Sequence, residues 1–92
     1  MPSDWCKTKR DLDDFISFVV LYGPNEFPPW RNLTMDVALE EISRGIESCS
    51  AELGSEEVVA KARALVADAT VAYRAGNVVA GAHLLQDLAA LL

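Results

Sequence analysis

Three stretches of the chain place apolar residues at the three- and four-residue spacing that lines one face of a helix. These apolar seams are Leu12, Phe15, Ile16, Val19 and Tyr22, then Met35, Leu39, Ile42, Ile46, Cys49 and Leu53, then Val59, Ala62, Val66, Ala69 and Tyr73. A fourth stretch, residues 78–92, is apolar on nearly every side. No stretch alternates convincingly with the period of two that marks a strand, so the pattern predicts helices alone.

Residue types that begin and end helices stand between these stretches. The expected N-caps are Thr8 (with Asp11 reaching back as in a capping box), Thr34, Ser55 and Asn77, and the expected stops are Gly23, Gly54 and Gly76. We therefore expect an all-α fold: one domain over residues 1–92, built as a small antiparallel bundle of about four helices. A tight hairpin joins the last two, residues 1–7 form a flexible or locally packed tail, and residues 23–34 form a proline-rich aromatic loop.

The composition indicates a folded protein and argues against a nucleic-acid partner. It has 92 residues and is 51% hydrophobic, which is too apolar for a disordered acidic tail. The 14 Asp and Glu against 8 Lys and Arg give a net charge of −6, which argues against nucleic-acid binding because phosphates require surplus basic residues. Residues 36–57 carry the entire imbalance, since the rest of the chain sums to zero.

The acidic residues of the second helix are the first candidate binding site. They are Asp36, Glu40, Glu41 and Glu47, all expected on its wet side with Arg44 among them. Arg44 can pair with three of them at helical spacing, but one arginine cannot neutralise all four. Such a face would attract a basic protein partner. The alternative is a solvated face that keeps a small domain soluble.

The loop after the first helix is the second candidate. Phe27, Trp30 and Arg31 are residue types enriched at binding hot spots, and the prolines around them restrict the chain before it binds. The alternative is that Phe27 and Trp30 fold back and close the end of the bundle.

Surplus apolar residues suggest a third surface. A second copy of the chain could cover residues of the first and last helices and form a homodimer. The candidates for that surface are Phe18, Leu21, Leu84, Leu88 and Leu91. The alternative is that the four helices cover them.

The sequence contains no recognisable catalytic or metal-binding motif. His83 is the only histidine, and Cys6 and Cys49 are too far apart for a metal or redox motif. We expect Cys49 to be a buried thiol, with a disulfide to Cys6 as the alternative. We expect no cofactor, no metal and no enzymatic activity, the alternative being an enzyme that uses the acids around Glu40 or Glu47.

The expected location is the cytoplasm. No apolar stretch of signal-peptide length follows the basic residues near the start, and no run approaches the ~20 apolar residues that span a bilayer. No membrane partner is expected.

Two resemblances accompany this reading. Residues 72–77, running into residues 80–85, resemble the turn of a tetratricopeptide helix pair, without a second repeat. In size, acidity and the exposed-looking aromatic loop, the chain resembles the small acidic helical immunity proteins of bacterial toxin systems. That resemblance implies a protein that binds and blocks a cognate toxin, often a basic nuclease. The alternative function is a homodimeric structural or adaptor protein without a toxin partner.

Overall fold

The computed structural model describes residues 8–23, residue 27 and residues 34–92, and four helices make up most of them. The helices are α1 (Lys9–Tyr22), α2 (Met35–Ser48), α3 (Glu56–Arg74) and α4 (Val78–Leu91). The described residues contain no strand. The all-α prediction is therefore confirmed.

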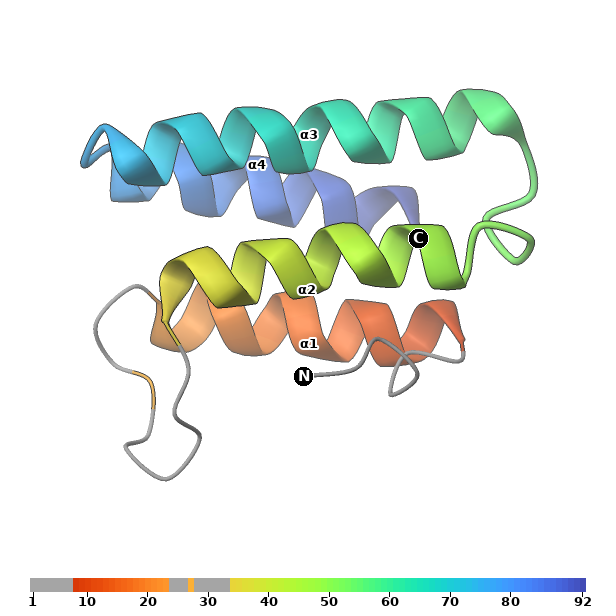
Figure 1. Ribbon diagram of the computed structural model, residues 1–92, viewed down its shortest axis with the longest axis horizontal. Coiled ribbons are helices and arrows are strands. Elements are labelled where there is room, and N and C mark those ends of the chain that lie inside the picture. Colours follow the sequence, from red (N-terminus) through yellow and green to blue (C-terminus); the bar gives the residue numbers. More distant parts are fainter. Residues whose placement is uncertain (1–7, 24–26, 28–33) are drawn as a thin grey trace.

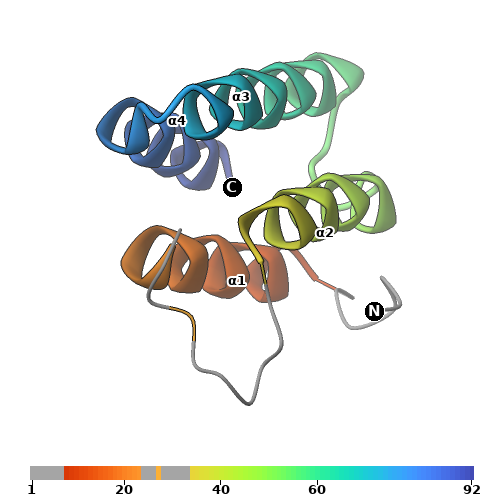
Figure 2. The same cartoon turned by 60° about the vertical axis from the view of Figure 1, so that its left-hand side comes forward.

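The helices form an antiparallel bundle in which each runs opposite to the one before it (Figure 1). The α3–α4 pair packs over the α1–α2 pair (Figure 2). Each helix packs mainly against two neighbours, so that the order around the bundle is α1, α2, α3, α4 and back to α1. The α1–α4 side and the α2–α3 side consequently lie opposite one another.

Side-chain caps hold the starts of three helices. The Thr8 hydroxyl accepts from the Asp11 amide at 3.2 Å, and the Asp11 carboxylate accepts from the Thr8 amide at the same distance. Thr34 and Ser55 cap α2 and α3 with bonds of 3.3 Å. These three caps confirm the sequence prediction. Asn77 stands at the N-cap of α4 but makes no side-chain capping bond.

The second helix ends earlier than its apolar seam. It stops at Ser48, and the backbone then makes turns in which the amides of Glu52 and Leu53 donate to the carbonyl of Cys49. Ser48 and Ser50 flank this break, and serine favours such turns because its side chain competes for backbone hydrogen bonds. Leu53 is still buried in the core. The predicted apolar spacing therefore holds as far as Leu53, although the helix ends before the expected stop at Gly54.

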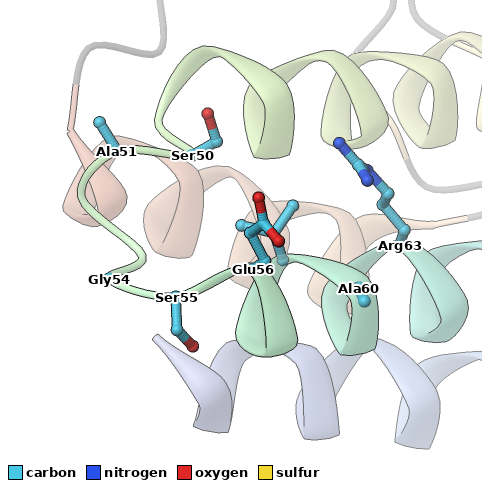
Figure 3. Close-up of a pocket in the computed structure, with 8 residues that line it drawn as sticks. Ser50, Ala51, Gly54, Ser55, Glu56, Ala60 and Arg63 are labelled. Carbon is cyan, nitrogen blue, oxygen red and sulfur yellow. The ribbon is translucent and has the colours of Figure 1, made fainter.

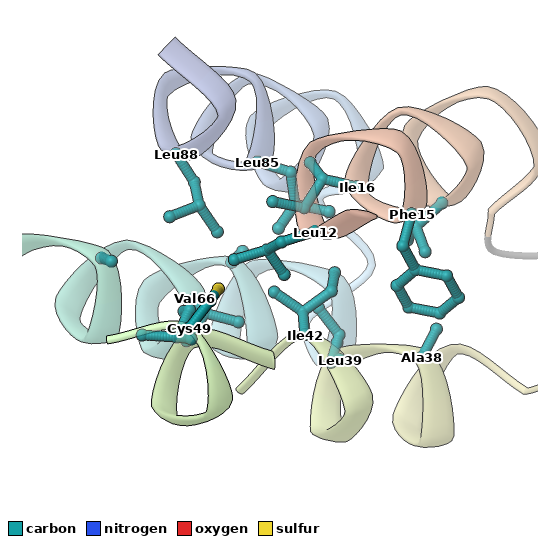
Figure 4. Packing of buried hydrophobic residues seen from close by; sticks show 14 of the residues in the cluster. Leu12, Phe15, Ile16, Ala38, Leu39, Ile42, Cys49, Val66, Leu85 and Leu88 are labelled. Atoms are coloured by element: carbon teal, nitrogen blue, oxygen red, sulfur yellow. The ribbon is translucent and has the colours of Figure 1, made fainter. Parts of the chain in front are cut away.

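All four helices contribute to one apolar core (Figure 4). Its largest fully buried side chains are Leu12, Ile16, Val19, Ile42, Ile46, Leu85 and Leu88. Val59, Ala62, Val66 and Ala69 of α3 are buried as well. The core faces of α1, α2 and α3 therefore follow most of the predicted spacing, except that Tyr22 at the end of the α1 seam is 37% exposed.

In the α3–α4 hairpin, Tyr73 of α3 packs against Gly81 of α4. Gly76 takes the left-handed conformation expected of the turn, with φ of 83°. Gly81 faces the Tyr73 ring so closely that a Cβ there would lie 2.7 Å from two ring carbons. The absent side chain of Gly81 thus makes room for an aromatic ring.

Candidate functional site

Two ion pairs join α2 to α3 across the bundle surface. The guanidinium of Arg63 donates to both carboxylate oxygens of Glu47, with an Nε to Oε2 distance of 2.8 Å. Arg74 Nε lies 3.4 Å from Asp36 Oδ1. Asp36 precedes Glu47 by eleven residues and Arg74 follows Arg63 by eleven, which is about three helical turns. Both pairs therefore match the same antiparallel register of the two helices.

The Glu47–Arg63 pair shifts the pKa of both partners toward their charged forms. The hydrogen bonds from Arg63 lower the pKa of Glu47 below its ordinary value of 4.5, and the positive charge of Arg63 adds to the effect. The same bonds raise the pKa of Arg63. Glu47 is thus held as a carboxylate, which suits charge recognition and does not suit proton transfer near neutral pH.

Arg44 pairs within α2, but not as widely as predicted. Its Nη2 lies 2.7 Å from Glu40 Oε1, and its Nη1 lies 3.8 Å from Glu41 Oε1. Glu47 instead bonds Arg63 of the next helix. Arg44 thus does not neutralise the acids of α2 alone, and α3 supplies two further arginines, Arg63 and Arg74.

Three of the four predicted acids face solvent and one does not. The side chains of Asp36, Glu40 and Glu47 are 70%, 59% and 53% exposed. Glu41 is only 2% exposed, which corrects its placement on the wet side of the helix.

Glu41 lies on the buried side of α2. Ala38 and Gly45 lie one turn before and one turn after it, and both are themselves buried. Glu41 is therefore removed from the candidate partner surface.

We define the α2–α3 surface by its exposed charged residues. These are Asp36, Glu40, Arg44, Glu47, Arg63 and Arg74. A hollow of about 670 Å³ continues it toward the α2–α3 turn. Its lining is Ser50, Ala51, Gly54, Ser55, Glu56, Val59, Ala60 and Arg63. Figure 3 shows Arg63 reaching from α3 toward α2 at one edge of this hollow.

Of the three binding residues predicted in the aromatic loop, the structure describes Phe27. Phe27 is half-buried and stacks on Phe18 with ring centroids 5.9 Å apart. It packs against the core, as the alternative reading expected, and does not project as an anchor for a partner. Trp30 and Arg31 lie outside the described residues.

Most of the predicted dimer residues belong to the bundle itself. Leu88 is fully buried, because the spacing of Gly81, Leu85 and Leu88 turns it into the core, so its assignment to a dimer surface is wrong. Phe18, Leu84 and Leu91 are half-buried and pack against the core. Leu21 alone of the five faces solvent, at 70% exposure.

A hollow of about 470 Å³ opens beside Leu21 between α1 and α4. Its lining is Ile16, Ser17, Val20, Leu21, Gln86 and Ala89. Val79, in the first turn of α4, is 71% exposed at the same end of the bundle. The sequence pattern missed Val79, Gln86 and Ala89, because the fourth helix is too uniformly apolar to reveal which side is covered.

Groups with other chemistry are scattered. Cys49 is buried and its thiol donates to the Gly45 carbonyl at 2.9 Å, while Cys6 lies outside the described residues. His83 is exposed on α4. Within residues 8–23, 27 and 34–92, no three His, Cys, Asp or Glu side chains come together as metal ligands. In that same part of the chain, no helix has the length and apolar character to cross a membrane.

Comparison with known protein families, with curated proteins and with solved structures finds no match for the chain.

Proposed function

We propose that the protein is a non-enzymatic protein-binding module whose α2–α3 surface docks a basic partner. Its most concrete form is an immunity-type protein that binds and blocks a basic toxin. The observation that carries this proposal is the exposure of Asp36, Glu40 and Glu47 on one side of the bundle. Each carboxylate is more than half exposed although each is already bonded to an arginine.

The internal ion pairs are compatible with docking. Exposed pairs contribute little to stability and are screened by salt, so the basic groups of a partner can compete for the same carboxylates. The pairs also limit the repulsion between neighbouring acids and hold their side chains in fixed positions. A partner then meets carboxylates that are ordered before it binds, which lowers the entropy lost on association.

Further acidic side chains lie next to this surface, at and after the turn between α2 and α3. Glu52, Glu56 and Glu57 are all exposed; Lys61 Nζ lies 3.8 Å from Glu57, and Glu52 accepts from the backbone amide of Lys9 at 3.2 Å. These acids add negative charge beside the α2–α3 surface, which would speed the approach of a basic protein.

The test compares two variants with the same net charge. Asp36→Asn, Glu40→Gln and Glu47→Gln together remove three exposed charges from the α2–α3 surface. The matched control, Asp14→Asn, Asp68→Asn and Asp87→Asn, removes three exposed charges from α1, α3 and α4. Both variants keep their side chains nearly unchanged in size.

Each protein is used as bait in cells that encode the chain, and the recovered proteins are identified by mass spectrometry. The proposal predicts a basic partner that the wild type and the control recover and the surface variant loses. Equal recovery by both variants would show that the acids serve solubility alone.

A further inference from the structure

Arg63 stands between two carboxylates that could balance its charge. It binds both oxygens of Glu47 across the α2–α3 surface, and it also lines the hollow of about 670 Å³ beside the α2–α3 turn. Glu56 lines the same hollow, and within the described part of the chain its carboxylate makes no hydrogen bond or ion pair. Figure 3 shows the Glu56 and Arg63 side chains at this hollow. Arg63 therefore has an unpaired carboxylate near it besides the one that it binds.

The spacing along α3 places these two side chains on one face of the helix. Arg63 follows Glu56 by seven positions, which is about 10.5 Å along the axis and a difference of only about 20° in direction. Side chains of a helix lean toward its N-terminus, so the long Arg63 side chain leans toward the turn that carries Glu56. Ala60 lies between them in the lining and is too small to obstruct this path. The aliphatic part of an arginine can also lie on such apolar lining while its guanidinium stays in water.

The bond from Arg63 to Glu47 is replaceable. The two side chains are 59% and 53% exposed, and exposed pairs contribute little to stability and are screened by salt. A basic group of a partner bound at Glu47 would repel the guanidinium of Arg63, because the two charges have the same sign. Among the described residues that line the hollow, Glu56 supplies the one carboxylate that could then balance Arg63.

We propose that Arg63 is a two-position side chain, which holds Glu47 in the free protein and turns into the hollow toward Glu56 when a basic partner takes Glu47. The trigger rests on the proposed function, whereas the two positions of Arg63 are a property of this chain alone. The movement takes the positive charge of Arg63 away from the partner and keeps it paired. Glu47 can then serve two uses in turn, alignment with α3 before binding and contact with the partner afterwards.

The first test removes Glu47 and needs no partner. In nuclear Overhauser spectra, the Nε proton of Arg63 should contact Glu47 in the wild type and Glu56 in Glu47→Ala. Adding Glu56→Gln to Glu47→Ala should make the Arg63 side chain more mobile, with a lower order parameter at Nε. Adding Glu57→Gln instead is the matched control, because it removes the same charge from the same exposed turn and should leave that order parameter unchanged.

The second test adds an acetylated hexa-arginine peptide to the wild type at low salt, where charge attraction is least screened. As the peptide binds the α2–α3 surface, the contacts of Arg63 should move from Glu47 to Glu56. Because the substituted side chains are exposed, the variants of both tests should fold, and circular dichroism verifies this.

The outcomes separate this inference from the proposed function. If Arg63 makes no contact with Glu56 in Glu47→Ala, the two positions are refuted. If the peptide binds and Arg63 stays on Glu47, the trigger is refuted. A peptide that leaves the amide shifts of α2 unchanged would count against the proposed function, while the contacts in Glu47→Ala would still decide whether Arg63 has a second position.

Discussion

Arg63 binds both carboxylate oxygens of Glu47 from the adjacent helix, sixteen positions further along the chain. Arg74 and Asp36 make the second contact in the same register, three turns away. Sliding α3 along α2 by one turn would separate both pairs together. The acids that dominate the charge of the sequence therefore also help to align the two central helices.

The Glu47–Arg63 bond predicts a pH-dependent contribution to stability. The folded-state pKa of Glu47 lies below 4.5, so the contribution is present above that pH and is lost as the pH falls through the folded-state pKa. Urea unfolding of the wild type and Arg63→Gln should show the wild type more stable at about pH 7 and the difference smaller at about pH 3. A difference that stays constant with pH would mean that Arg63 stabilises the fold in another way.

Gly81→Ala should destabilise the bundle although alanine is the better helix former. The added Cβ would lie 2.7 Å from ring carbons of Tyr73, and such overpacking costs about 1–3 kcal/mol against a helix-propensity gain of about 1 kcal/mol. Thermal unfolding measures the net loss. Combining Gly81→Ala with Tyr73→Leu should remove the clash and recover stability, and independent effects of the two changes would exclude this steric explanation.

Tyr73→Phe should leave the protein as stable as the wild type or stabilise it by up to about 1 kcal/mol, because the buried Tyr73 hydroxyl makes no hydrogen bond within the described part of the chain. Burial raises the pKa of Tyr73 above 10.0. The unfolded chain then ionises first, so wild-type stability should fall as the pH rises above about 10. Unfolding curves at alkaline pH should show less of this loss in the phenylalanine variant. A clearly less stable variant would reveal a bond to the hydroxyl.

The helix caps should differ in importance. Ser55→Ala removes the bond to the Val58 amide and should cost about 1 kcal/mol in urea unfolding. Asn77→Ala removes no side-chain capping bond and should cost less. Equal losses at the two positions would show that backbone conformation matters more than the capping bond here.

Local patterns were enough to predict the helices. The apolar spacing and the residues Thr8, Thr34 and Ser55 act within a few positions; the three caps form as expected, and every member of the α1 seam except Tyr22 is buried. The apolar spacing of the second helix also predicts the burial of Leu53, which lies in the core although α2 ends before it. Local signals did not determine every boundary, since α2 ends at Ser48 and Asn77 makes no side-chain capping bond.

The candidate surfaces depend on contacts between distant positions. Arg74 meets Asp36 across 38 positions, and no helical spacing within α2 reveals that partner. Glu41 is buried on the same side of α2 as Ala38 and Gly45, and that burial depends on packing outside its own helix. Leu88 was assigned to the surface because an almost uniformly apolar helix does not show which side is covered.

Under the proposed function, the exposed carboxylates of the α2–α3 surface bind a basic protein. Calorimetric titration of the recovered partner with the surface and control variants, at low and moderate salt, tests it most directly. The claim predicts that Asp36→Asn, Glu40→Gln and Glu47→Gln together weaken binding by about tenfold or more at low salt, with a smaller effect at higher salt. The control with Asp14, Asp68 and Asp87 neutralised should stay within about twofold of the wild type. Equal affinities for the two variants at low salt would contradict the claim.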